Sequence, residues 1–134
     1  RTDQSLRNPA RKVLEKVGLL HRADIAAENL SHGEQRQLEL AMALATKPSL
    51  LVLDEPMAGM GLEDSRQMLT LLKSLKGQVT ILMVEHDMDA VFKLADRITV
   101  LVYGQAIATD TPEIIQNDPD VKAAYLGEEK TCSM

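Results

Sequence analysis

Hydrophobic residues along this chain follow two patterns, helical spacing and short continuous runs. Helical spacing predicts helices at residues 9–17, 34–46, 63–75 and 90–95. In the second of these, the spacing places Leu38, Ala41, Met42 and Ala45 on the inward face. Residues 50–53 and 79–84 are apolar runs without polar alternation, which is typical of strands buried on both faces.

The C-terminal third has the pattern of a hairpin followed by short helices. Residues 98–103 and 105–109 predict two strands joined at Gly104. Thr111-Pro112 and Asp118-Pro119 each place a capping residue before a proline that can start a helix, and Gly127 follows as a stop. The order of elements predicts an α/β fold, with a mostly parallel sheet flanked by helices and a C-terminal hairpin.

Polar and titratable residues follow both apolar runs at the point where each predicted strand ends. Asp54 and Glu55 follow the first run, and Glu85, His86 and Asp87 follow the second. In open parallel sheets, ligands bind beyond the carboxyl ends of the strands. Asp54 could hold Mg²⁺ through water, and Glu55 could orient or deprotonate an attacking water. The alternative is that polar residues simply end strands, and that His86 is an ordinary loop histidine.

A glycine-bearing turn, Leu30-Ser31-His32-Gly33-Glu34-Gln35, precedes the second predicted helix. Free backbone amides and the positive end of the helix dipole suit a phosphate at such a turn. Ser31 and Glu34 also have the spacing of a capping box, which needs no ligand. The two interpretations are compatible, since a phosphate could use amides that the cap leaves free.

Composition and charge narrow the classes of function. The chain has 134 residues, 45% of them hydrophobic and 26% charged, which suits one small globular domain. A net charge of −5 and the scarcity of aromatic residues argue against a nucleic-acid partner. The apolar runs are too short to cross a bilayer, so we expect no direct membrane insertion. The single cysteine, Cys132, cannot form an internal disulfide, and the three histidines lack metal-ligand spacing.

Taken in order, these segments resemble the C-terminal half of a P-loop, RecA-like ABC-transporter ATPase subunit. The turn at residues 30–35 resembles the signature loop, residues 50–54 the Walker B strand, and residues 58–61 the D-loop. The resemblance implies that Glu55 is the catalytic glutamate, that His86 is the switch histidine and that Asp54 holds Mg²⁺ through water. It also implies that Ser31, His32, Gly33 and Glu34 contact ATP bound to a partner subunit.

The sequences of residues 30–39, 54–60, 84–88 and 117–127 are similar to those of the branched-chain amino acid uptake ATPases, and urea-uptake ATPases share much of this similarity. His32 and Glu34 stand where the commonest signature has Gly and Gln, and Gly61 stands where the D-loop often has Asp. No Walker A motif (Gly-x-x-x-x-Gly-Lys-Ser/Thr) and no glutamine loop occur in these residues. We therefore expect residues 1–134, which begin with Arg1, to be a partial ABC ATPase domain. We also expect this chain to bind ATP weakly or not at all when alone.

The resemblance implies partners and a location. ATP and Mg²⁺ would bind in a complete dimer with a second ATPase subunit, docked on membrane subunits at the cytoplasmic face of the cell membrane. A sheet face or edge left uncovered would favour self-association. Two other functions remain open: an inactive module that pairs with complete ATPase subunits, and an ATPase of the DNA-repair branch. Acidic charge and the absence of heptads argue against the latter.

Overall fold

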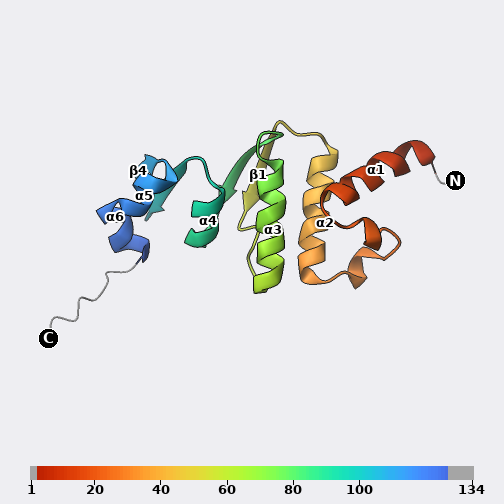
Figure 1. Ribbon diagram of the computed structural model, residues 1–134, viewed down its shortest axis with the longest axis horizontal. Coiled ribbons are helices and arrows are strands. Elements are labelled where there is room, and N and C mark those ends of the chain that lie inside the picture. The colour runs from red at the N-terminus through yellow and green to blue at the C-terminus, as the bar shows by residue number, and fades with distance from the viewer. Residues whose placement is uncertain (1–2, 127–134) are drawn as a thin grey trace. The chain divides into compact units, whose positions relative to one another are not determined.

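The computed structural model describes residues 3–126, and the chain divides into two compact units between His86 and Asp87. The predicted stop at Gly127 and the single cysteine, Cys132, lie outside the described residues. The α/β fold predicted from the sequence is confirmed, because both units combine helices with strands (Figure 1).

The first unit is a two-stranded parallel sheet with helices packed against it. Its helices are α1 (Gln4–Lys16), the 3₁₀ helices η1 (Leu20–Arg22) and η2 (Ala27–Asn29), α2 (His32–Ala45) and α3 (Leu62–Leu75). Its strands are β1 (Leu50–Asp54) and β2 (Thr80–Val84), paired from Leu50↔Thr80 to Asp54↔Val84. Along the unit, α1 packs on α2, and α2 packs on α3 (Figure 1).

Helix α1 begins five residues earlier than the sequence pattern predicts. Asp3 caps it by accepting a hydrogen bond from the Ser5 amide at 3.0 Å, and Pro9 lies inside the helix rather than at its start. At its other end, α1 stops just before Gly18, whose φ of 78° is the left-handed conformation that ends helices. A side-chain cap thus overrides the proline as the start signal.

The inward face of α2 also differs from the prediction. Leu40 and Ala41 are buried, whereas Met42 is 66% exposed. The reason is that α2 contacts both α1 and α3, so its buried surface is set by two neighbours rather than by one apolar stripe.

The prediction that both strands are buried on two faces is wrong. Leu51 is buried towards the helices, but Leu50, Val52, Leu82 and Val84 are exposed, Val52 by 62% and Val84 by 57%. Alternate residues of a strand point to opposite faces, and helices cover only one face of this sheet. The expectation of an uncovered apolar face is confirmed, while self-association through it stays a prediction.

The second unit is the predicted hairpin with short helices around it. It comprises α4 (Met88–Leu94), β3 (Ile98–Val102), β4 (Gln105–Asp110), α5 (Pro112–Asn117), α6 (Pro119–Val121) and the π-helix η3 (Lys122–Leu126). Tyr103 and Gly104 join the strands with φ of 48° and 77°, the two positive values of a type I′ turn. Ile98, Val100, Ile115 and Val121 form the core of this unit.

We expect Leu72→Ala to lower the free energy of unfolding by about 2–5 kcal/mol, because Leu72 is fully buried and truncation leaves a cavity. Leu62→Ala on the same helix is the matched control: Leu62 is 71% exposed, and its loss should cost about 0.5 kcal/mol or less. Urea unfolding followed by circular dichroism measures both. Equal losses in the two variants would contradict the assigned core.

Candidate functional site

The carboxyl ends of β1 and β2 bring Glu55 and His86 together. Because the strands are parallel and Asp54 pairs with Val84, the residues that follow each strand emerge at one edge of the sheet. His86 Nδ1 lies 3.1 Å from Glu55 Oε1, although the residues are 31 positions apart. A carboxylate oxygen only accepts, so the imidazole donates from Nδ1 and keeps Nε2 for another partner.

The backbone at Glu55 takes an unusual conformation that directs this side chain. Glu55 has a φ of 44°, in the left-handed region that non-glycine residues rarely adopt. Its amide donates to the Val84 carbonyl at 2.8 Å, and its carbonyl accepts from the Ala58 amide at 3.0 Å. The chain therefore leaves β1 through a tight turn whose first residue is held by β2. Such strained positions cluster at functional sites.

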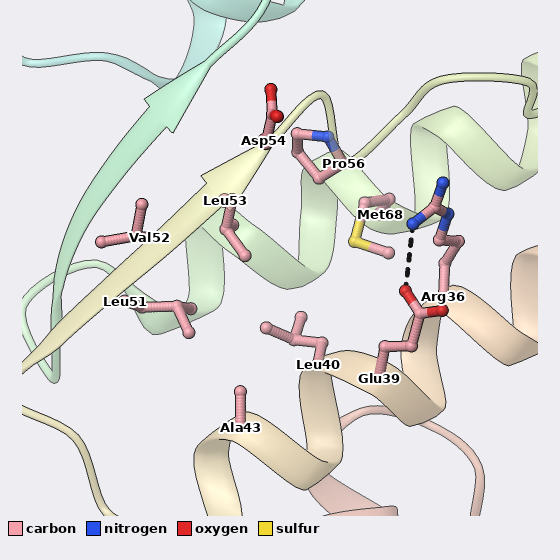
Figure 2. A pocket seen from close by; sticks show the side chains of 10 residues that line it. All are labelled: Arg36, Glu39, Leu40, Ala43, Leu51, Val52, Leu53, Asp54, Pro56 and Met68. Carbon is pink, nitrogen blue, oxygen red and sulfur yellow. Dashed lines mark hydrogen bonds and ion pairs between the residues drawn. The ribbon is translucent and has the colours of Figure 1, made fainter.

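Asp54 ends β1 with an exposed side chain at the same edge of the sheet. A hollow of about 240 Å³ lies beside it, between β1, α2 and α3 (Figure 2). Leu40, Leu51 and Met68 supply apolar walls, while Arg36 donates to Glu39 at 3.0 Å on its rim. Among the described residues, no cluster of three or more His, Cys, Asp or Glu side chains could hold a metal ion by itself.

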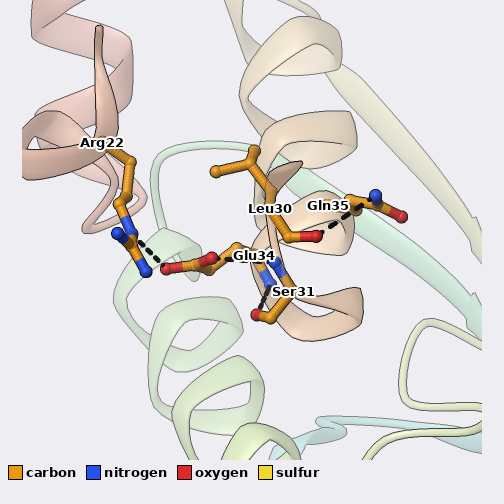
Figure 3. Close-up of polar contacts among 5 residues, drawn as sticks. All are labelled: Arg22, Leu30, Ser31, Glu34 and Gln35. Atoms are coloured by element: carbon orange, nitrogen blue, oxygen red, sulfur yellow. Dashed lines mark hydrogen bonds and ion pairs between the residues drawn. The ribbon is translucent and has the colours of Figure 1, made fainter. Parts of the chain in front are cut away.

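The glycine-bearing turn begins α2 with the capping box predicted from the sequence. Ser31 Oγ accepts from the Glu34 amide at 3.2 Å, and Glu34 Oε2 accepts from the Ser31 amide at 2.9 Å (Figure 3). Gln35 Nε2 donates to the Leu30 carbonyl at 3.3 Å, which fixes the approach to the helix. The remaining first-turn amides have no acceptor within the helix.

Arg22 adds an ion pair to this turn that the sequence did not predict. Its Nε lies 2.7 Å from Glu34 Oε1, so both carboxylate oxygens of Glu34 are engaged within the chain. The hydrogen bond from Arg22, followed by that from the Ser31 amide, lowers the pKa of Glu34. No sequence spacing links Arg22 to Glu34, since the contact depends on how η1 folds back towards α2.

The turn also lies against the segment that resembles a D-loop. His32 Nε2 is 3.5 Å from the Ala58 carbonyl, and a Cβ at Gly33 would approach the Asp64 carboxylate to between 2.6 and 2.9 Å. A side chain at position 33 would therefore require the Asp64 carboxylate to shift. The predicted site residues fall into two groups: Asp54, Glu55 and His86 at the sheet edge, and Ser31, His32, Gly33 and Glu34 at the start of α2.

Solved structures place this arrangement among the ABC ATPase folds. An ATP-binding cassette of an ABC transporter in its ADP conformation matches 96% of the chain with a TM-score of 0.83 and 32% identity, and the chain covers 52% of it. A nucleotide-free ATP-binding cassette matches 95% of the chain with a TM-score of 0.82 and 33% identity, with 52% of its own length covered. The fold is that of part of an ABC ATPase domain.

Sequence comparisons show which proteins the chain resembles. Residues 2–58 match the ABC transporter family model, and residues 107–131 match that of the branched-chain amino acid ATP-binding cassette transporter. LivG of Escherichia coli, a high-affinity branched-chain amino acid transport ATP-binding protein, is 45% identical over 86% of the chain and 46% of its own length. BraF of Pseudomonas aeruginosa, which has the same description, is 42% identical over the same shares.

These matches confirm the predicted resemblance to ABC-transporter ATP-binding subunits of the branched-chain amino acid type. LptB of Haemophilus influenzae, a lipopolysaccharide export ATP-binding protein, is 35% identical over 96% of the chain and 54% of its own length. The chain spans about half the length of the curated relatives it matches. Within the described residues, no helix has both the length and the apolar character of a membrane span.

The ion pair between Arg22 and Glu34 predicts that the stability of the folded chain depends on pH through the carboxyl group of Glu34. A lowered pKa in the folded state contributes stability above the carboxyl's unfolded value near 4.5, and this stability is lost as pH falls through the folded pKa. Glu34→Gln should therefore be less stable than the unmodified chain at pH 7, and the gap should narrow by pH 3. Urea unfolding at both pH values measures this difference in stability.

The same ion pair predicts that Arg22→Ala raises the pKa of Glu34. Carboxyl ¹³C NMR titration measures this pKa, and an unchanged value would contradict the pairing.

The contact between Gly33 and Asp64 predicts coupling between the two positions. Gly33→Ala gains up to about 1 kcal/mol of helix propensity but forces the Asp64 carboxylate to move. In the Asp64→Ala background, where that carboxylate is absent, the same substitution should be more favourable by about 0.5–1.5 kcal/mol. A double-mutant cycle of unfolding free energies measures this coupling, and additivity within about 0.3 kcal/mol would show that the contact does not form.

Proposed function

We propose that this chain is the C-terminal part of the ATP-hydrolysing subunit of an ABC importer, whose complete form couples ATP hydrolysis to uptake of branched-chain amino acids. The observation that carries the proposal is the contact between Glu55 and His86 at the carboxyl edge of a parallel strand pair, where open α/β sheets bind ligands. The relatives LivG and BraF, both described as branched-chain amino acid transport proteins, support the class of solute.

Glu55 and His86 have different roles in hydrolysis: the carboxylate acts on water, and the imidazole contacts the phosphate. The half-exposed carboxylate of Glu55 orients a water molecule and accepts a proton from it as the water oxygen attacks phosphorus. His86 donates from Nδ1 to Glu55, which fixes the ring and leaves Nε2 to contact the γ-phosphate. The pair thereby links the position of the water to the position of the phosphate.

Asp54 is the residue of this chain that fits Mg²⁺. Its exposed carboxylate sits next to Glu55, and Mg²⁺ is commonly held by one or two carboxylates together with phosphates and water. When bound with ATP, the ion neutralises charge on the phosphates. The phosphate-cradling Walker A loop does not occur among these 134 residues, so nucleotide binding needs groups from outside them.

The turn at the start of α2 is the surface for ATP bound to a second subunit. Ser31 offers its hydroxyl, and His32 and Gly33 offer first-turn amides at the positive end of the helix dipole. The carboxylate of Glu34 is already bonded to Arg22 and to the Ser31 amide. Glu34 therefore contributes to ATP binding through its backbone and by ordering this turn. In this proposal, the subunit pair docks on membrane subunits at the cytoplasmic face of the membrane.

A chimera with the relative LivG tests the proposal, with residues of this chain replacing the aligned 117-residue segment. LivG then supplies the phosphate-binding half. We expect Mg²⁺-dependent ATP turnover by the chimera and a fall in kcat of about 100-fold or more on Glu55→Gln, because the carboxylate that orients water is lost. A phosphate-release assay measures turnover.

Glu113→Gln is the matched control, since it removes a carboxylate of the same kind from the exposed surface of α5. Its turnover should equal that of the unmodified chimera. Near-normal kcat in the Glu55→Gln chimera would contradict the assigned role. The purified 134-residue chain should show no turnover by itself, and Mg²⁺-dependent activity that Glu55→Gln abolishes would contradict the need for groups from outside it.

A further inference from the structure

Glu85 joins the two segments that carry Glu55 and His86. Its Oε1 accepts from the amide of Met57, two residues after Glu55, at 3.2 Å. Its Oε2 accepts from the amide of His86 at 3.1 Å. One carboxylate thus bonds the turn after β1 with one oxygen and the irregular segment after β2 with the other. The sequence signal was Glu85's place directly before His86, and it suggested no role by itself.

The Met57 amide lies in a part-buried place where a missing acceptor would be costly. Met57 and Pro56 are buried, and Met57 is the third residue of the turn that the Ala58 amide closes onto the Glu55 carbonyl. A buried amide without an acceptor loses a hydrogen bond that water would otherwise supply. Without Glu85, the turn would be free to rearrange towards a conformation that hydrates this amide.

Glu55 is the residue that such a rearrangement would move. Its φ of 44° is an unfavourable conformation that persists only where surrounding contacts hold it. The bond from its amide to the Val84 carbonyl is one of those contacts, and the bond from Met57 to Glu85 is another. If the turn relaxes, the carboxylate of Glu55 leaves the 3.1 Å contact with His86 Nδ1.

We propose that Glu85 is a positioning residue for hydrolysis: its two carboxylate oxygens tie the turn after β1 to the segment after β2 and so hold Glu55 against His86 Nδ1. The inference rests on the proposed function for its catalytic meaning, while its geometry is independent of nucleotide. Glutamine is an inadequate replacement, because its amide has one acceptor oxygen for two amide donors. Aspartate is one methylene shorter and cannot span both segments as glutamate does.

The histidine tautomer is the test, read by ¹⁵N NMR of the 134-residue chain at a pH where the imidazole is neutral. A bond from Nδ1 to Glu55 favours the Nδ1–H tautomer, whereas free histidine favours Nε2–H. We expect Glu85→Ala and Glu85→Gln to shift His86 towards Nε2–H. We also expect amide exchange at Met57 to become about tenfold faster or more in both variants.

Glu15→Gln on α1 is the matched control, because it removes an exposed carboxylate from the same unit and should leave the tautomer unchanged. An unchanged tautomer in a folded Glu85 variant would overturn the proposal, because the bonds of Glu85 to the two amides would then not position Glu55. If Glu85→Ala fails to fold, the isosteric Glu85→Gln decides. In the unmodified chain, an Nε2–H tautomer together with an unprotected Met57 amide would also overturn it.

The tautomer is measured without nucleotide, so its result is independent of the turnover measured for the LivG chimera. A lost Nδ1–H tautomer with an inactive chimera would support the positioning role and contradict the proposed function. An unchanged tautomer with an active, Glu55-dependent chimera would support the function and contradict the positioning role.

Discussion

The parallel pairing of β1 with β2 is the constraint on which the candidate site depends. Its register places Asp54 opposite Val84, so the first residue beyond β1 hydrogen bonds to the last residue of β2. That bond holds Glu55 in a left-handed conformation, and the turn that follows directs its carboxylate to His86. A shift of one residue in this register would point the strand's side chains to the opposite face.

The two groups of site residues differ in how the negative charge of their carboxylates is compensated. At the start of α2, the carboxylate of Glu34 is neutralised by Arg22 and by backbone donors, so the turn is already ordered before any ligand arrives. At the sheet edge, Asp54 and Glu55 bring two carboxylates that would meet a phosphate only with compensating positive charge. The turn therefore has its carboxylate compensated within the chain, while the two carboxylates at the sheet edge do not compensate each other.

One face of the parallel sheet formed by β1 and β2 is apolar and is left uncovered by helices. Parallel sheets in α/β proteins have both faces covered, yet Leu50, Val52, Leu82 and Val84 are exposed here. The relatives that match the chain are about twice as long as the matched segment. Apolar exposure of this kind is what a sheet presents when helices cover only one of its faces, as they do among the described residues.

The sequence by itself determined the order of elements, the hairpin at Gly104, the cap at Ser31 and the identity of the acid and imidazole at the strand ends. These are local properties, set by spacing, by turn chemistry and by motif order. Tertiary structure decided which sheet face is covered, the inward face of α2, and the roles of Arg22, Asp64 and Glu85. Those features depend on contacts between residues distant in the chain, and a one-dimensional pattern carries no signal for them.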